Sequence, residues 1–168
     1  AEPSRPAIPS LVTFGQATSY TADRLKELNG AGAGIYVTPN NFTGSTRRLA
    51  DNCKGINAWF MECDDLTKTQ QFALITFAKL EPSFVVETAK SYHTYWMAKD
   101  GRVENFRDIQ SGLIKAFGAD QANKDPSRVL RIPGFNHMKR EPYPVKLIIA
   151  NPQNVYTEAQ MMEAFPSG

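Results

Sequence analysis

The chain has 168 residues, 42% of them hydrophobic, and a formal net charge of +2 at pH 7. This size and composition fit one compact domain with its own core, and no repeats or low-complexity tracts occur. No apolar stretch is long enough to span a bilayer, so we expect a soluble protein without a membrane partner. Cys53 and Cys63 lack the paired spacing of a zinc site, which favours a reducing, cytoplasmic setting.

The charge is unevenly distributed along the chain. Residues 124–146 contain six Lys and Arg residues against Asp125 and Glu141, so this segment carries +4 and the rest carries −2. A clustered basic segment favours a partner that bears phosphate groups.

The first predicted elements carry little chemistry. Residues 1–10 contain three prolines and no clear pattern, and we interpret them as a flexible arm. Thr21 is suited to cap a helix that Gly30 would end, and residues 35–37 have the apolar pattern of a strand.

An apolar strand pattern at residues 59–61 leads directly into the acids Glu62, Asp64 and Asp65. On an extended strand, Glu62 and Asp64 would share one face. Two adjacent carboxylates repel each other unless a cation lies between them, and paired oxygen ligands suit Mg²⁺ or Mn²⁺. The residues alone leave two interpretations open, a divalent-metal site or solvated acids in a turn.

The next segment predicts a helix and a β-hairpin. Thr67 and Gln70 have the spacing of a capping box, and residues 84–88 and 92–97 have strand patterns joined by a tight turn. In that turn region, the Ser91 hydroxyl, a backbone N–H and the His93 imidazole would be able to converge on a phosphate. A packed or surface histidine is the alternative, and it is our interpretation of His137.

The last third of the chain predicts a helix over residues 103–117 that Gly118 would end, followed by short strands at 129–132 and 145–150. A second capping-box pair, Thr157 with Gln160, opens the final helix.

Between these elements, the run from Asp125 to Lys139 places one acid ahead of three cations. That order suits a metal-bound triphosphate, although a solvated basic edge would have the same composition. Strand alternation puts Arg128 and Arg131 on opposite sides, and an extended chain from Asp125 would favour Arg131 as the triphosphate contact.

Three stretches together resemble the archaeo-eukaryotic primase superfamily, most closely its RepB-type plasmid and phage primases and primase-polymerases. They are Phe-Met-Glu-Cys-Asp-Asp at 60–65, Glu-Pro-Ser-Phe-Val-Val-Glu-Thr to Ser-Tyr-His-Thr-Tyr-Trp at 81–96, and Asp-Pro-Ser-Arg-Val-Leu-Arg-Ile-Pro-Gly-Phe-Asn-His-Met-Lys at 125–139. The order and spacing of all three motifs carry the resemblance, which extends from about Gly34 to Ile149.

The resemblance implies a catalytic core in which two divalent metals, Mg²⁺ or Mn²⁺, are bound by Glu62, Asp64 and Asp125. Adjacent acids in some relatives make Asp65 an alternative to Glu62. The small-x-His motif falls on Ser91 and His93, which implies contacts to the phosphates of an incoming NTP or dNTP. Arg128, Arg131 and Lys139 fall on the phosphate-binding or template-binding positions of the third motif.

We therefore expect an α+β fold, with a mixed or antiparallel sheet, packed helices and an RRM-like half. The expected activity is template-dependent nucleotidyl transfer that makes primers on single-stranded DNA. The resemblance also implies that residues 1–168 are one catalytic domain of a longer replication protein, with a helicase as a possible partner. A metal-dependent nuclease and a non-catalytic nucleic-acid-binding replication module are the alternatives.

Overall fold

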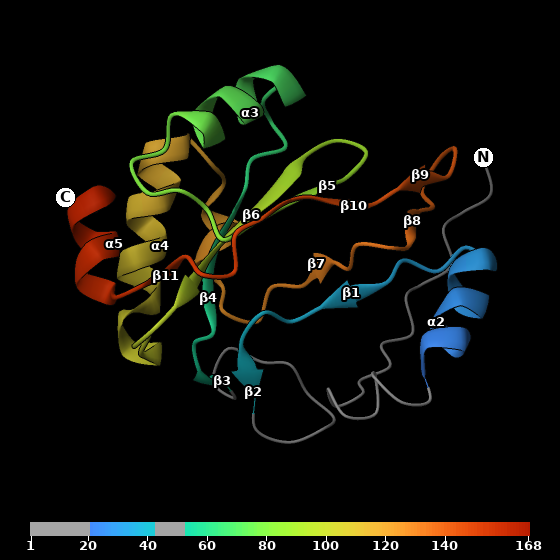
Figure 1. Ribbon diagram of the computed structural model, residues 1–168, viewed down its shortest axis with the longest axis horizontal. Coiled ribbons are helices and arrows are strands. Elements are labelled where there is room, and N and C mark those ends of the chain that lie inside the picture. The colour runs from blue at the N-terminus through green and yellow to red at the C-terminus, as the bar shows by residue number, and fades with distance from the viewer. Residues whose placement is uncertain (1–20, 43–52) are drawn as a thin grey trace.

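The computed structural model of the protein describes residues 21–42 and 53–168 (Figure 1). The expected arm at residues 1–10 lies outside these ranges. The helices are α2 (Thr21–Gly30), α3 (Lys68–Thr76), α4 (Val103–Phe117), α5 (Glu158–Ala164) and the 3₁₀ helix η2 (Gln121–Lys124). The strands are β1 (Tyr36–Val37), β2 (Asn41–Phe42), β3 (Cys53–Gly55), β4 (Ala58–Glu62), β5 (Phe84–Glu87), β6 (Tyr92–Ala98), β7 (Leu130–Arg131), β8 (Asn136–His137), β9 (Tyr143–Pro144), β10 (Lys146–Ala150) and β11 (Val155–Tyr156).

The main sheet is built around β6. Strands β4 and β5 pair with it on its two sides in antiparallel register, and β10 continues the sheet beyond β5. β11 runs parallel to the end of β6 at Met97 and Ala98, so the sheet is mixed. β5 and β6 form the hairpin that the sequence predicts.

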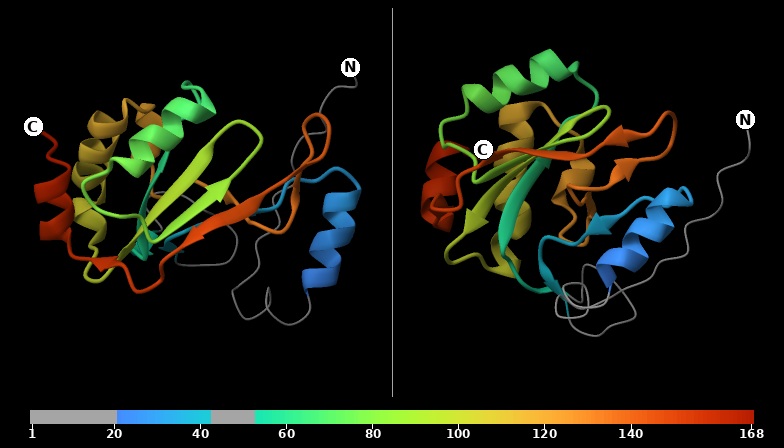
Figure 2. Two further views of the ribbon diagram at one scale, coloured as in Figure 1. Left: turned by 45° about the horizontal axis from the view of Figure 1, so that its top comes forward. Right: turned by 45° about the vertical axis from the view of Figure 1, so that its right-hand side comes forward.

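Helix α4 supplies most of the helical side of the core. Its buried face, which includes Phe106, Ile109 and Leu113, packs against the sheet with Trp59, Phe60 and Trp96 of β4 and β6. Gly118 ends the helix with φ 63°, a left-handed conformation that favours glycine. Figure 2 shows α4 and α5 together at one end of the molecule, away from α2.

The opposite end is made of small elements. β1 pairs with β7, β8 pairs with β9, and both pairs are antiparallel (Figure 1). Asn29 connects α2 to β8, because its side chain donates to the carbonyl of Asn136 and accepts from the Asn136 N–H, both at 2.9 Å. We call α2, β1, β7, β8 and β9 the small lobe.

Lys68 holds the β8–β9 hairpin to the main sheet. Its Nζ donates to the Thr88 carbonyl at 2.9 Å and to the Tyr143 hydroxyl at 3.3 Å, and it pairs with Glu87 at 3.2 Å. The ammonium group also lies over the Tyr92 and Tyr143 rings. The first turn of α3 is thereby connected to both β5 and β9.

The predicted fold class, α+β with a mixed sheet and packed helices, is confirmed. Both capping boxes, Thr67 with Gln70 and Thr157 with Gln160, are present. None of the described helices is both long and apolar enough to cross a membrane.

Candidate active site

Glu62 ends β4, and its peptide group is held in place by a side-chain amide. Because β6 is the one strand among the described residues that pairs with β4, the N–H and C=O of alternate residues point away from the sheet and need other partners. Asn123 of η2 meets both at Glu62: its Oδ1 accepts from the Glu62 N–H at 3.1 Å, and its Nδ2 donates to the Glu62 carbonyl at 3.0 Å. Gln110 of α4 does the same for Phe60.

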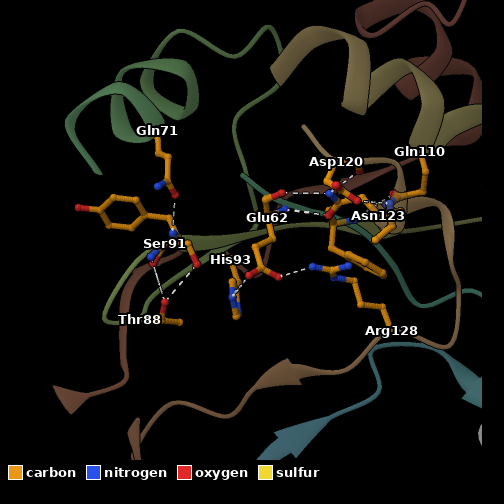
Figure 3. A network of polar contacts seen from close by, with 12 residues as sticks. Glu62, Gln71, Thr88, Ser91, His93, Gln110, Asp120, Asn123 and Arg128 are labelled. Carbon is orange, nitrogen blue, oxygen red and sulfur yellow. Dashed lines mark hydrogen bonds and ion pairs between the residues drawn. The ribbon is translucent and has the colours of Figure 1, made fainter. Parts of the chain in front are cut away.

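The Glu62 carboxylate lies between the side chains of Arg128 and His93 (Figure 3). Arg128 Nη2 donates to its Oε2 at 2.8 Å, and His93 Nε2 lies 3.6 Å from its Oε1. Burial raises the pKa of the Glu62 carboxyl, but hydrogen bonds and charges from His93 and Arg128 outweigh burial and lower that pKa to about 2. Glu62 is therefore ionised and paired within the protein.

Asp64 and Asp65 are arranged differently from the prediction. β4 ends at Glu62, and the chain then turns, with the Leu66 N–H donating to the Cys63 carbonyl at 3.4 Å. Asp64 and Asp65 are exposed in this turn. The prediction that Glu62 and Asp64 share a strand face was wrong in its premise, because the extended conformation stops before Asp64.

Asp125 also lies in a turn. Its Oδ1 accepts from the Ser127 N–H at 2.9 Å and from the Ser127 hydroxyl at 2.7 Å, and its carbonyl accepts from the Arg128 N–H. The chain from 125 to 128 is thus not extended. The prediction that an extended chain favours Arg131 over Arg128 as the triphosphate contact therefore loses its premise. The turn instead brings Arg128 to Glu62, while Arg131 is placed by β7.

Three acids are the candidates to hold a divalent metal. Glu62, Asp64 and Asp125 offer carboxylate oxygens, which are the ligands that Mg²⁺ and Mn²⁺ prefer. In residues 21–42 and 53–168, however, no three His, Cys, Asp or Glu side chains lie close enough together to hold an ion. The chemistry of the acids fits a metal, but their positions do not bring them together while Arg128 and His93 pair with Glu62.

Ser91 lies in the tight turn between β5 and β6. Its N–H donates to Thr88 Oγ1 at 3.1 Å, and the two hydroxyl groups are also 3.1 Å apart. Ser91 is 2% exposed. In this arrangement its hydroxyl closes the turn that precedes His93.

Arg131 occupies the small lobe with an aromatic partner. Its guanidinium lies 4.8 Å from the centroid of the Tyr36 ring, directly across the β1–β7 pair. A Cβ on Gly34 would come within 2.7 Å of that ring, so glycine is needed there for the ring to take its place. Arg131 is 7% exposed, and its Nη1 has no hydrogen-bond partner.

His137 lies within the basic segment at residues 124–146, where the sequence predicted a packed or surface histidine. Burial lowers the pKa of the His137 imidazole, and the positive charges of Arg131, Lys139, Lys90 and His93 lower it further. These four side chains therefore lie near enough to His137 to affect it. Lys139 itself is exposed in the β8–β9 connection. The sequence signal that could have identified His137 as a site residue was its position two residues before Lys139.

Several buried polar atoms near this site have no hydrogen-bond partner. The buried side-chain nitrogen and oxygen atoms of the described residues that lack a partner are His93 Nδ1, Arg128 Nε, Arg131 Nη1, His137 Nδ1, Asn40 Nδ2 and Trp59 Nε1. Four of these belong to the second and third motifs. Buried polar groups are normally hydrogen-bonded, and a ligand with acceptor oxygens is one kind of partner that suits such nitrogens.

The described residues thus form an α+β fold in which a strand-end acid, Glu62, is paired with Arg128. The family described as the RepB DNA-primase N-terminal domain matches residues 15–165. The chain belongs to this family.

Solved structures have the same fold. The chain superposes on the AEP domain of the cyanophage S-2L primase-polymerase with a TM-score of 0.74 and 27% identity, covering 87% of this chain and 77% of that one. It matches the catalytic domain of primase RepB′ in complex with initiator DNA with a TM-score of 0.61 and 23% identity, covering 86% and 71% of the two chains. The predicted resemblance to the primase superfamily is confirmed.

A replication protein from Clostridium perfringens is 28% identical over 135 residues, which are 71% of this chain and 33% of that protein. The chain therefore spans about a third of the length of this relative.

Proposed function

We propose that this chain is a DNA primase, possessing primase-polymerase activity, that joins nucleotides on single-stranded DNA in plasmid or phage replication. The observation that carries the proposal is the group of four unpaired nitrogens on His93, Arg128, Arg131 and His137, next to the paired Glu62. A nucleoside triphosphate supplies acceptor oxygens for such a group. A metal-dependent nuclease would have no need of it.

Each of these side chains would have a defined contact. Arg131, fixed by Tyr36, would direct Nη1 at a phosphate oxygen, and the His93 and His137 imidazoles would each offer Nδ1. Lys139 would add a more solvated charge. Arg128 would be able to transfer from Glu62 to the triphosphate, because its Nε is already without a partner.

Mg²⁺ or Mn²⁺ would be held by Glu62, Asp64 and Asp125, with Asp65 as the alternative to Glu62. When bound, two such ions supply activation of a 3′-hydroxyl and neutralisation of pyrophosphate. The protein's own part is to keep Glu62 ionised, to release it from Arg128 and to orient the triphosphate. NTP and dNTP are the expected substrates.

The template would be single-stranded DNA lying along the +4 segment at residues 124–146. The similarity to a RepB′ catalytic domain whose structure contains initiator DNA supports this partner. A longer replication protein in the cytoplasm, working with a helicase domain or protein, is the proposed context, since the chain spans a third of one relative.

Primer synthesis tests the proposal. The chain is incubated with single-stranded DNA, labelled nucleotides and Mg²⁺ or Mn²⁺, and the products are separated by length. We expect short labelled products that require both template and metal. Degradation of the DNA without incorporation would favour the nuclease, and binding without either reaction would favour the replication module.

A further inference from the structure

The outer edge of β4 is closed by amide side chains in place of a neighbouring strand. Asn40 accepts from the Ala58 N–H at 3.3 Å and from the Asn57 N–H at 3.0 Å. Gln110 and Asn123 then pair with both peptide groups of Phe60 and Glu62, respectively. These partners meet every second residue of the strand, because those residues direct their peptide groups outward. We call the three side chains the amide row.

Asn123 differs from the other members in what it connects. It lies two residues before Asp125 and five before Arg128, so one short segment meets Glu62 twice, at its peptide through Asn123 and at its carboxylate through Arg128. Figure 3 shows Asn123 and Arg128 approaching Glu62 from the same side.

The location of Asn123 is itself fixed. Its side chain is 0% exposed and also donates to the Asp120 carbonyl at 2.9 Å, while Gln110 Nε2 donates to the Asn123 carbonyl at 2.6 Å. Helix α4, η2 and β4 are thereby joined through two buried amides. Two hydrogen bonds to one peptide leave it little freedom to rotate.

We propose that Asn123 is a positioning residue that sets the place of the Glu62 carboxylate relative to the segment bearing Asp125 and Arg128. The metal-binding test of this inference rests on the proposed function, whereas its structural test, the Arg128 signal, does not. A one-residue shift in register turns the side chains of a strand to the other face. Loss of the two Asn123 hydrogen bonds at the end of β4 would therefore displace the Glu62 carboxylate more than the rest of the strand.

Asn40→Ala is the matched control for Asn123→Ala. Both substitutions remove a buried amide from the same strand edge, one near its start and one at Glu62. Both variants should lower the melting temperature. Only Asn123→Ala should weaken Mn²⁺ binding, measured by electron paramagnetic resonance of the free ion, by about 10–100-fold, which is the usual effect of losing a partner that orients a ligand. Asn40→Ala should stay within about twofold of the parent chain.

A second readout needs no metal. The Arg128 Nε–H signal in ¹⁵N-resolved NMR spectra, assigned with Arg128→Lys, should move in Asn123→Ala and stay in place in Asn40→Ala. If Asn123→Ala does not fold, Asn123→Ser, which retains one polar group, is measured instead and should show the same changes at smaller size.

The outcomes separate the two proposals. Equal effects of the Asn40 and Asn123 variants on the Arg128 signal and on Mn²⁺ binding would overturn the positioning role, as would an unchanged Asn123 variant. If the parent chain binds no Mn²⁺, the proposed metal function fails, and the Arg128 signal alone decides the role of Asn123.

Discussion

The two sides of the candidate site differ in how their polar groups are held. On the strand side, Gln110 and Asn123 satisfy the outward peptide groups of β4 and Arg128 pairs with Glu62, while His93 Nδ1 and Arg128 Nε have no partner. On the small-lobe side, Arg131 and His137 keep buried nitrogens without partners. The β4 peptide groups and the Glu62 carboxylate are therefore held within the chain, whereas nitrogens on both sides are left open, and we propose that a ligand completes them.

The largest expected effect is on the exposed acids. Asp64→Asn and Asp125→Asn should each reduce primer synthesis by more than the roughly 10–100-fold that follows loss of an outer-shell metal partner. The melting temperature should change little, because both side chains are exposed. Primer yield per unit time is the measurement. Near-normal synthesis by either variant would remove that residue from the metal site, and Asp65→Asn compared with Glu62→Gln identifies the uncertain ligand.

Glu62→Gln should also change stability, in a pH-dependent way. The folded-state pKa of Glu62 is about 2, below the ordinary value of 4.5, so its ionised form stabilises the fold above pH 4.5. This contribution, on the order of 2–3 kcal/mol, is lost as pH falls from about 5 towards 2. Urea unfolding of both chains should show a difference at pH 7 that shrinks through this window. A constant difference would mean that the Arg128 and His93 contacts do not lower the pKa.

Arg131→Ala tests the small-lobe side of the site. Loss of a charged hydrogen-bond donor should raise the apparent KM for nucleotide roughly tenfold or more. The salt dependence of single-stranded DNA binding should change little, since the side chain is buried rather than laid along the surface. Arg140→Ala removes the same charge from an exposed position in the same segment and serves as the control. Similar KM values for both variants would show that net charge, rather than the Arg131 contact, matters.

Lys139→Ala should have the smallest effect. The side chain is exposed, so water and salt screen its attraction to phosphate. We expect nucleotide affinity to fall by about twofold to threefold at low salt and the difference to disappear near 1 M salt. Titrations at several salt concentrations measure this. A tenfold loss that persists at high salt would instead place Lys139 in a buried contact with the ligand.

Sequence patterns predicted the fold well where local signals were strong. Capping boxes, the left-handed Gly118 and alternating apolar residues in β5 and β6 each act within a few neighbouring residues, and each appears as predicted. The predicted strand at 145–150 corresponds to β10. The family followed from the order of three motifs, which no single motif would have indicated.

The candidate site was less predictable because its geometry depends on turns and distant contacts. A strand that stops at Glu62 and a turn at 125–128 changed the directions assigned to Asp64 and Arg128. Asn123 and Gln110 were not identified as site residues, since an amide bonded to a peptide 50 or more positions away leaves no local pattern. His137 required knowledge of its basic neighbours in space.

The central claim is that the unpaired nitrogens of the site bind a triphosphate. Equilibrium binding of a non-hydrolysable nucleoside triphosphate, the matching monophosphate and the nucleoside to the parent chain tests it most directly, with Arg131→Ala and Arg140→Ala measured alongside. We predict that the triphosphate binds at least about tenfold more tightly than the monophosphate, and that Arg131→Ala, but not Arg140→Ala, reduces this preference. Equal affinity for the three ligands, or a preference unchanged in Arg131→Ala, would contradict the account.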